Sequence, residues 1–294
     1  MSRLVFPDGY RDTGIFEKNT QSTETQEKNE QLKKMYHKWL EHIDSQLDNS
    51  KSYSGYNGIQ YLTCFDSYLQ SDFPRIMIFG REANSADYAF DKRNDDFKDI
   101  YRHDLYYSYE YAISHPQDSY AKHRAKTRFL QTRKLICSFK DNEPSEKDIL
   151  SVSVNNLNKI SKGGKYTPCD DNIDEIIYSD FWYNDLKANI FIHELNILRP
   201  THLVFLCGKG YNNHFKRDFG EKFYIKANET INALNVKTKP VSEPVTLNKD
   251  EACEIFDIEN YDVNLIFAIH PSAHMSADIR KTYEDKLTDF IKES

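Results

Sequence analysis

The pattern of apolar positions along the chain predicts four buried strands that alternate with helices. Continuous apolar runs occur in RIMIFG (75–80), DILSVSVNN (148–156), THLVFLCG (201–208) and NLIFAIH (264–270). Runs of this length, with helical stretches between them, are typical of parallel strands that are covered on both faces. We therefore expect an α/β fold, a three-layer α/β/α sandwich with a central, mainly parallel four-stranded sheet.

Three further segments repeat apolar residues at the spacing of a helix, over residues 29–47, 185–198 and 276–294. The apolar positions of the first segment are Leu32, Met35, Trp39, Ile43 and Leu47. Those of the second segment run from Leu186 to Leu198, and Ser276 offers an N-cap to the third. We expect all three segments to pack as helices on the sheet.

The remaining segments define the domain organisation. Residues 1–28 are polar and lack periodic apolar positions, which predicts a flexible N-terminal arm. Residues 29–294 are then a single domain that carries an aromatic and basic insertion at about 98–140. Residues 219–262 contain KPVSEPVTL, which indicates an extra loop or an edge strand.

Composition excludes several classes of protein. A formal net charge of −7 argues against a protein that coats nucleic acid non-specifically, although a local basic groove stays possible. The 5 cysteines are odd in number and widely spaced, with no CxxC pair, so we expect no disulfide framework and no metal site. The chain has no run of 18 apolar residues and no apolar leader, so we expect a cytoplasmic protein without membrane contact.

The loops that follow the four predicted strands are the places to look for a site. Ligands of parallel sheets bind at the carboxyl ends of the strands, where such loops converge. These loops read GREANSADYAF, NNLNKISKGG, CGKGYNNHF and HPSAHMS.

Taken in order, the four loops resemble the uracil-DNA glycosylase superfamily over residues 70–290. FGREAN loosely matches the first motif of that family, and NNLNK supplies its Asn-x-x-Lys pattern as Asn156 and Lys159. ELNILRPTHLVFLCG is similar to the third motif, and His270, Pro271 and Ser272 match the fourth. The resemblance implies a glycosylase-like domain and a monofunctional DNA N-glycosylase without cofactor. Such an enzyme hydrolyses the N-glycosidic bond of a flipped-out uracil-like or modified pyrimidine and leaves an abasic site.

The first loop departs from the family pattern. Glu82 lies where the family has a catalytic Asp or Asn, and Ala83 lies where proline is common. Asn84 replaces a ring that excludes five-substituted pyrimidines in one branch, so the pocket should be wider beside C5. A wide pocket suits the hypermodified bases of viral DNA, which makes antiviral defence an alternative to DNA repair.

The resemblance gives the catalytic roles to Glu82, His270 and Asn84. His270 would donate a hydrogen bond to the base as it gains negative charge. Glu82 would orient the attacking water and stabilise the positive charge on the sugar, as carboxylates do in glycoside hydrolysis. Asn84 or Asp87 would take this role if the loop alignment is shifted.

The base itself must leave the stack before it can be read. Asn156 has an amide that can match a pyrimidine edge with two hydrogen bonds, although Asn155 is adjacent and differs only in register. Tyr88 and Phe90 are the rings that we expect to stack on the base.

DNA contacts are expected on both sides of this pocket. His274 and Met275 could act as a wedge, and the segment AKHRAKTRFLQTRK is the strongest basic cluster in the chain. The residues expected to contact DNA are Ser272, His274, Met275, Lys159, Lys209, Arg124 and Arg128.

Other functions fit the sequence less well. His270 and His274 have the spacing of a metal pair, but Pro271 begins a turn between them. CGKGY is too short for a P-loop, which argues against an NTPase. The main alternative is a glycosylase-fold protein, expected to be a monomer, that binds nucleic acid or a protein partner without cleaving. The direction of the Glu82 carboxylate would distinguish the two.

Overall fold

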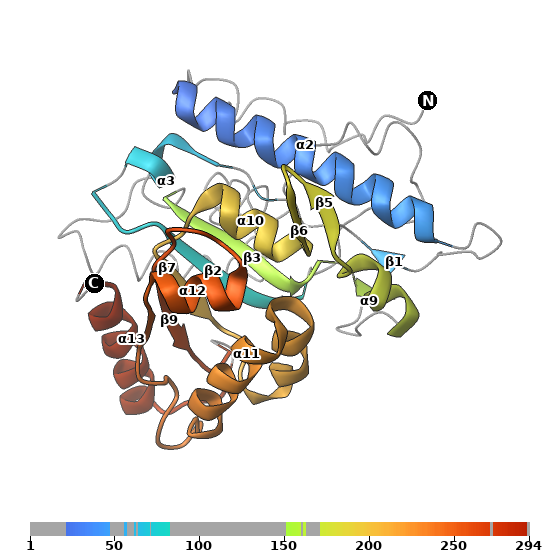
Figure 1. The fold of residues 1–294 in the computed structure, drawn as a ribbon. Helices are drawn as coiled ribbons and strands as arrows, with labels where there is room; N and C mark the ends of the chain where they lie inside the picture. Colours follow the sequence, from blue (N-terminus) through green and yellow to red (C-terminus); the bar gives the residue numbers. More distant parts are fainter. Residues whose placement is uncertain are drawn as a thin grey trace, which may run out of the picture.

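The protein is an α/β protein with a mostly parallel five-stranded sheet at its centre (Figure 1). The computed structural model describes residues 22–47, 56–57, 62, 64–70, 72–82, 151–159, 161–162, 171–270 and 273–292. In order across the sheet, the strands are β3 (Val152–Asn158), β2 (Ile76–Glu82), β7 (His202–Phe205), β9 (Val263–Phe267) and β8 (Val245–Leu247). The α/β class is confirmed, and each of the four apolar runs forms a strand.

The described sheet has five strands where four were expected. The fifth strand, β8, pairs antiparallel with β9 at the edge of the sheet, with Val245 opposite Leu265. It comes from the KPVSEPVTL segment, for which the sequence allowed an extra loop or an edge strand, and the structure has the edge strand. The same region also contains α12 (Lys249–Phe256), whose N-cap Asn248 forms a capping box with Glu251.

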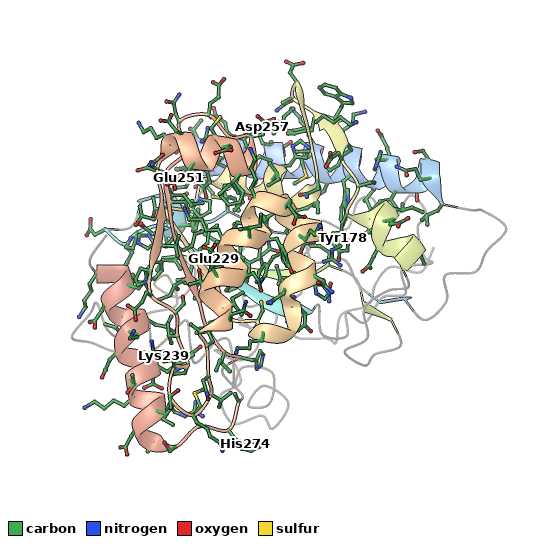
Figure 2. All side chains as sticks on the ribbon, turned by 60° about the horizontal axis from the view of Figure 1, so that its bottom comes forward. Tyr178, Glu229, Lys239, Glu251, Asp257 and His274 are labelled. Carbon is green, nitrogen blue, oxygen red and sulfur yellow. The ribbon has the colours of Figure 1, made fainter. Side chains whose placement is uncertain are left out.

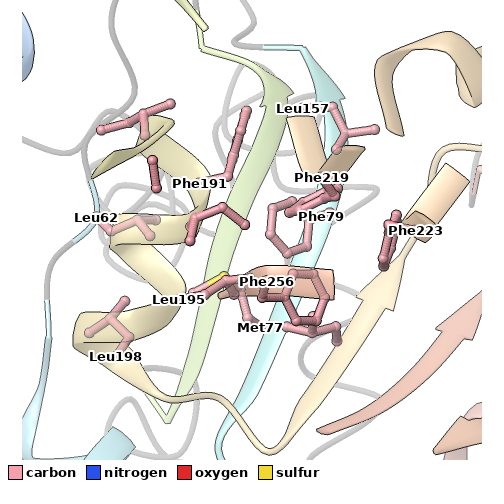
Figure 3. Close-up of a cluster of buried hydrophobic side chains, with 14 of the residues drawn as sticks. Leu62, Met77, Phe79, Leu157, Phe191, Leu195, Leu198, Phe219, Phe223 and Phe256 are labelled. Carbon is pink, nitrogen blue, oxygen red and sulfur yellow. The ribbon is translucent and has the colours of Figure 1, made fainter. Parts of the chain in front are cut away.

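The larger part of the core lies on one face of the sheet (Figure 3). Phe79, Phe205 and Phe267 occupy the same level of three neighbouring parallel strands. Their rings stack at centroid distances of 4.9 Å and 5.0 Å. The helices that cover this face are α2 (Thr23–Gln46), α10 (Ile190–Leu198), α11 (Asn212–Asn232) and α12.

The opposite face packs against α13 (Ala277–Lys292), which is red in Figure 1. Tyr283, Leu287 and Phe290 of this helix are buried against apolar side chains of the sheet. Ser276 precedes the helix and its Oγ accepts a hydrogen bond from the Ile279 amide at 3.4 Å, so the predicted N-cap is present. Helices therefore cover both faces of the sheet.

Helix α2 begins six residues earlier than the sequence indicated. Ser22 caps its first turn by accepting a hydrogen bond from the Thr25 amide, and both the amide and the hydroxyl of Ser22 donate to Asp66 in α3 (Asp66–Gln70). Residues 23–28, which we assigned to the N-terminal arm, are therefore helical. Residues 1–21 lie outside the described residues.

The predicted helix over residues 185–198 is shorter than expected. Leu186 lies in strand β6 (Leu186–Ala188), which forms a hairpin with β5 (Phe181–Tyr183). Asn184 and Asp185 make the turn with φ of 47° and 63°, the conformation that two-residue hairpins require. The helix α10 starts at Ile190, where the side chain of Asn189 accepts from two backbone amides.

The remaining described elements are short. They are β1 (Tyr56–Asn57), which pairs with β4 (Ser161–Lys162), helix α9 (Asp171–Ile177), and the 3-10 turn η1 (Lys209–Tyr211) that leads into α11. No helix in the described parts of the chain is both long and apolar enough to cross a membrane.

Candidate active site

The carboxyl ends of the parallel strands meet at one edge of the sheet. In the pairing of β2 with β3, Gly80 is level with Asn156 and Glu82 is level with Asn158. On the other side of β2, the Leu206 amide donates to the Phe79 carbonyl at 2.8 Å. The chain runs outward from β2 to β3 and then returns across β2 to β7, so its direction of winding reverses beside β2. Such a switch point is the usual ligand site of an open parallel sheet.

His270 follows the last parallel strand at the same edge. The Gly208 amide donates to the Ala268 carbonyl at 3.1 Å, which holds the loop after β7 against the end of β9. His270 lies two residues further on, is partly exposed, and its carbonyl accepts from the Ala273 amide in a turn. Glu82 ends β2 and His270 follows β9, and β7 is the one strand between them in the described sheet.

Asn155 is committed to the core and is not available to a ligand. Its Nδ2 donates to Glu194 Oε2 at 2.8 Å, and its Oδ1 accepts from Lys159 Nζ at 2.7 Å. The same Oδ1 accepts from the Asn156 amide at 2.8 Å. Of the two asparagines left open by the sequence, Asn156 is therefore the one that retains the candidate role. Its side chain is buried.

Lys159 does not reach the surface, so its predicted contact with DNA is wrong. Its ammonium lies 2.5 Å from Glu194 Oε1, and both side chains are fully buried. Glu194 also accepts from the Tyr36 hydroxyl, so three donors surround the carboxylate. Burial lowers the pKa of Lys159, and the neighbouring Glu194 carboxylate opposes that shift.

Asn158 is a candidate site residue that was not predicted from the sequence. Its Oδ1 accepts a hydrogen bond from Arg217 Nη2 at 3.1 Å. The amide oxygen therefore faces Arg217, and the amide nitrogen Nδ2 faces away from it. Its Nδ2 is buried and has no hydrogen-bond partner among the described residues. A buried amide group with a free donor is unusual in a folded protein and suits a ligand acceptor. The sequence did contain an indication of this residue. Asn158 is two residues after Asn156 in NNLNK, and residues two apart lie on the same face of a strand.

Arg217 holds this end of β3 in place. Its guanidinium lies 3.6 Å from the centre of the Tyr178 ring and pairs with Asp174 and Asp218. Nη2 also donates to the Leu157 carbonyl at 2.7 Å. These contacts make Arg217 a positioning residue for Asn158.

His214 is a second residue that the sequence reading did not single out. It lies one helical turn before Asp218, on the same side of α11 and nearer to the start of that helix. Burial, and then the Arg217 cation, lower the pKa of His214 to about 4, so its ring is neutral at pH 7. Nδ1 is buried without a partner in the described structure, and the ring packs on Tyr211 at 4.7 Å. A neutral imidazole can donate to or accept from a polar ligand group.

Three more of the predicted residues have described side chains. Lys209 and His274 are exposed, and the Lys209 ammonium donates to the Asn232 carbonyl at 3.0 Å. Met275 is partly buried against the smaller core cluster beside α13, which favours an anchoring role over a wedge. Only the backbone of Glu82 is described. The predicted residues outside the described ones are Asn84, Asp87, Tyr88, Phe90, Arg124, Arg128 and Ser272, together with the insertion at 98–140.

Comparisons with known proteins add no family assignment. A scan against models of known protein families gives no match, and a search of curated proteins finds no similar sequence. Among the residues that the structure describes, no three His, Cys, Asp or Glu side chains form a group that could hold a metal ion.

Proposed function

We propose that the protein is a DNA glycosylase with a three-layer, uracil-DNA-glycosylase-like fold. The observation that carries the proposal is the convergence of strand ends at one switch point. Gly80 of β2 is level with Asn156 of β3, while the Gly208 amide bonds to Ala268, two residues before His270. The sequence motifs that resemble the superfamily therefore belong to neighbouring strand ends, although they lie far apart along the chain.

The chemistry needs three functions at this edge. In the reaction, the water oxygen bonds to C1′ of the sugar while the bond from C1′ to the base nitrogen breaks. The base leaves with the electron pair of that bond and takes up a proton, and the water loses one. His270 would donate to the base as negative charge develops, and Glu82 would hold the water and offset the positive charge of the sugar. Asn156 or Asn158 would supply amide hydrogen bonds to the base edge.

The substrate is a flipped-out uracil-like or modified pyrimidine. The burial of two candidate residues supports a flipped-out base as the substrate. A base that enters from the surface would meet the partly exposed donor His270 first and the buried donor Asn158 afterwards. A role in repair predicts release of uracil or a damaged base. A role in antiviral defence predicts release of a bulky viral pyrimidine.

The test is base release from a panel of oligonucleotides, detected by alkaline cleavage at abasic sites. The panel contains uracil, hypoxanthine, hydroxymethyluracil and viral DNA with modified cytosine. We expect release from one substrate, reduced about 10²–10³-fold in His270→Ala. Glu82→Gln should reduce release as well, while the unfolding curves of both variants match that of the wild type. DNA binding without release from any substrate would favour the non-cleaving alternative.

A further inference from the structure

A basic turn, residues 235–239, lies beside the strand end that carries His270. Four hydrogen bonds close it. The amides of Asn235 and Lys239 each donate to the carbonyl of the other, at 2.8 Å and 2.7 Å. The Thr238 amide donates to the Asn235 carbonyl at 3.0 Å, and the Lys237 amide donates to Asn235 Oδ1 at 2.9 Å. The backbone of the basic turn is therefore held by hydrogen bonds at both of its ends.

The side chains of the basic turn have the character of a nucleic-acid contact. Lys237 and Lys239 are exposed, and Val236 between Asn235 and Lys237 is 37% exposed. Residues 230–242 contain no Asp or Glu, although the chain as a whole has a net charge of −7. Neither lysine forms an ion pair with a described residue, and the nearby Glu243 carboxylate is bound to Lys286 at 2.5 Å. Lys239 also helps to lower the pKa of Glu243, but neither ammonium group is held in an ion pair with a described residue.

The pairing of the following residues places the basic turn next to His270. Val241 bridges Ala268 in antiparallel register, the Ile269 amide donates to the Pro240 carbonyl at 2.9 Å, and the Ser242 amide donates to Phe267. This pairing brings residues 240–242 alongside residues 267–269, so the basic turn lies near the end of β9 from which His270 follows.

One other predicted DNA contact, Lys209, lies next to the basic turn. The Lys209 ammonium donates to the Asn232 carbonyl at the end of α11, just before the turn begins. Figure 2 shows Lys239 and His274 in the same lower part of the molecule, away from Glu251 and Asp257.

We propose that the basic turn binds the DNA backbone, with Lys239 and Lys237 contacting phosphates that flank the nucleotide at His270. This inference rests on the proposed function, because that function identifies DNA as the binding partner. It extends the DNA contacts to a segment that no sequence motif indicated. Val236 would add an apolar contact to the sugar or to a neighbouring base.

The test compares two double variants with the same change in net charge. Lys237→Gln with Lys239→Gln removes the positive charges of the basic turn. Lys33→Gln with Lys249→Gln is the control, because both lysines are exposed and lie away from His270. Lys33 is on α2, and Lys249 follows β8, whose Leu247 pairs with Val263 at the other end of β9 from His270. Binding to a fluorescent oligonucleotide, single-stranded and duplex, is measured by anisotropy across a salt series.

The wild type should show a linear fall of log affinity with log salt. In the turn variant this slope should become shallower by about 1.4 for single strands and about 1.8 for duplex, since two phosphate contacts are lost. The control should keep the slope of the wild type. An unchanged slope in the turn variant would overturn the inference even if base release is normal. Binding that depends on the turn but gives no base release would instead contradict the glycosylase proposal alone. Absence of DNA binding by the wild type would overturn both.

Discussion

The Lys159 ammonium and the Glu194 carboxylate form an ion pair of 2.5 Å inside the core, with neither side chain exposed. The pair joins β3 to α10, and the Tyr36 hydroxyl adds α2 by donating to Glu194 and accepting from the Leu62 amide. Asn155 completes the network from the residue that precedes Asn156. The end of β3, which carries the candidate base-reading residues, is therefore connected to α10 and α2 by this ion pair and its hydrogen bonds.

Removing one partner of this pair should be costly. Lys159→Met leaves the Glu194 carboxylate buried without its cation, so we expect a loss of about 3–5 kcal/mol in the free energy of unfolding. Combining Lys159→Met with Glu194→Gln removes the buried charge, and much of the stability should return. Denaturant unfolding of the two variants and the wild type measures both effects. Equal losses in the single and double variants would mean that the buried charge is not the cause.

The four parallel strands could be predicted from the sequence, but the buried ion pair could not. The continuous apolar runs identified the four parallel strands because strands buried on both faces tolerate few polar residues. Glu194 lies between Phe191 and Leu195 on the apolar stripe of its helix, which was a sign of a buried charge that needs a partner. The partner could not be recognised, because Lys159 is 35 residues away and the pairing depends on tertiary packing.

Local turn chemistry explains another difference. Leu186 fitted a helical stripe, but Asn184 and Asp185 between two short apolar runs are also a hairpin signal. The hairpin forms because both residues tolerate a positive φ, so the helix begins only at Ile190. The basic turn was missed for a different reason. Two lysines separated by one residue mean little until the pairing of Val241 with Ala268 brings their turn close to the strand end that leads to His270.

Gly220 allows α11 to bend. It has φ of 84° and ψ of 175°, and the bend brings Asn212 Nδ2 to 2.9 Å from Asn228 Oδ1. A Cβ at Gly220 would meet no atom within 4 Å, so any cost of Gly220→Ala comes from the backbone. We expect a loss of about 1–3 kcal/mol in the free energy of unfolding. Gly210→Ala is the control, because its Cβ also has open space and its φ lies outside the left-handed region. Comparable losses in the two variants would exclude backbone strain as the cause.

His202 should make stability depend on pH. Its ring packs on Phe290 at 5.2 Å, and burial lowers the pKa of His202 to about 4. The unfolded chain, with a pKa near the usual 6.5, binds the proton more strongly, so stability is full above pH 6.5 and falls as the pH decreases towards 4. Between pH 7 and pH 5 this residue should account for a loss of about 2 kcal/mol.

Denaturant unfolding of His202→Leu at the two pH values checks this assignment. The variant should lose about 2 kcal/mol less than the wild type between pH 7 and pH 5. His274→Leu, at an exposed position, should behave like the wild type. If His202→Leu retains the full pH dependence, the other buried histidines must carry it.

The choice between Asn156 and Asn158 as the reader of the base can be decided by isosteric substitution. Arg217 fixes the Asn158 amide so that Nδ2 is the donor left for a ligand. Asn158→Asp replaces that donor by an acceptor and keeps a partner for the Arg217 guanidinium, so the fold should persist. For a base that presents a carbonyl oxygen there, release should fall about 10²–10³-fold, the usual cost of removing a donor in the transition state.

The same assay on Asn156→Asp completes the comparison. Asn156 is level with Gly80, about 6–7 Å below Glu82 along the strand, whereas Asn158 is level with Glu82 itself. A base held near the Glu82 level would therefore depend more on Asn158, and Asn156→Asp should have the smaller effect on base release. The opposite order, with Asn158→Asp close to the wild type, would return the base-reading role to Asn156. It would also mean that the free Asn158 donor serves some group other than the base, such as a water molecule.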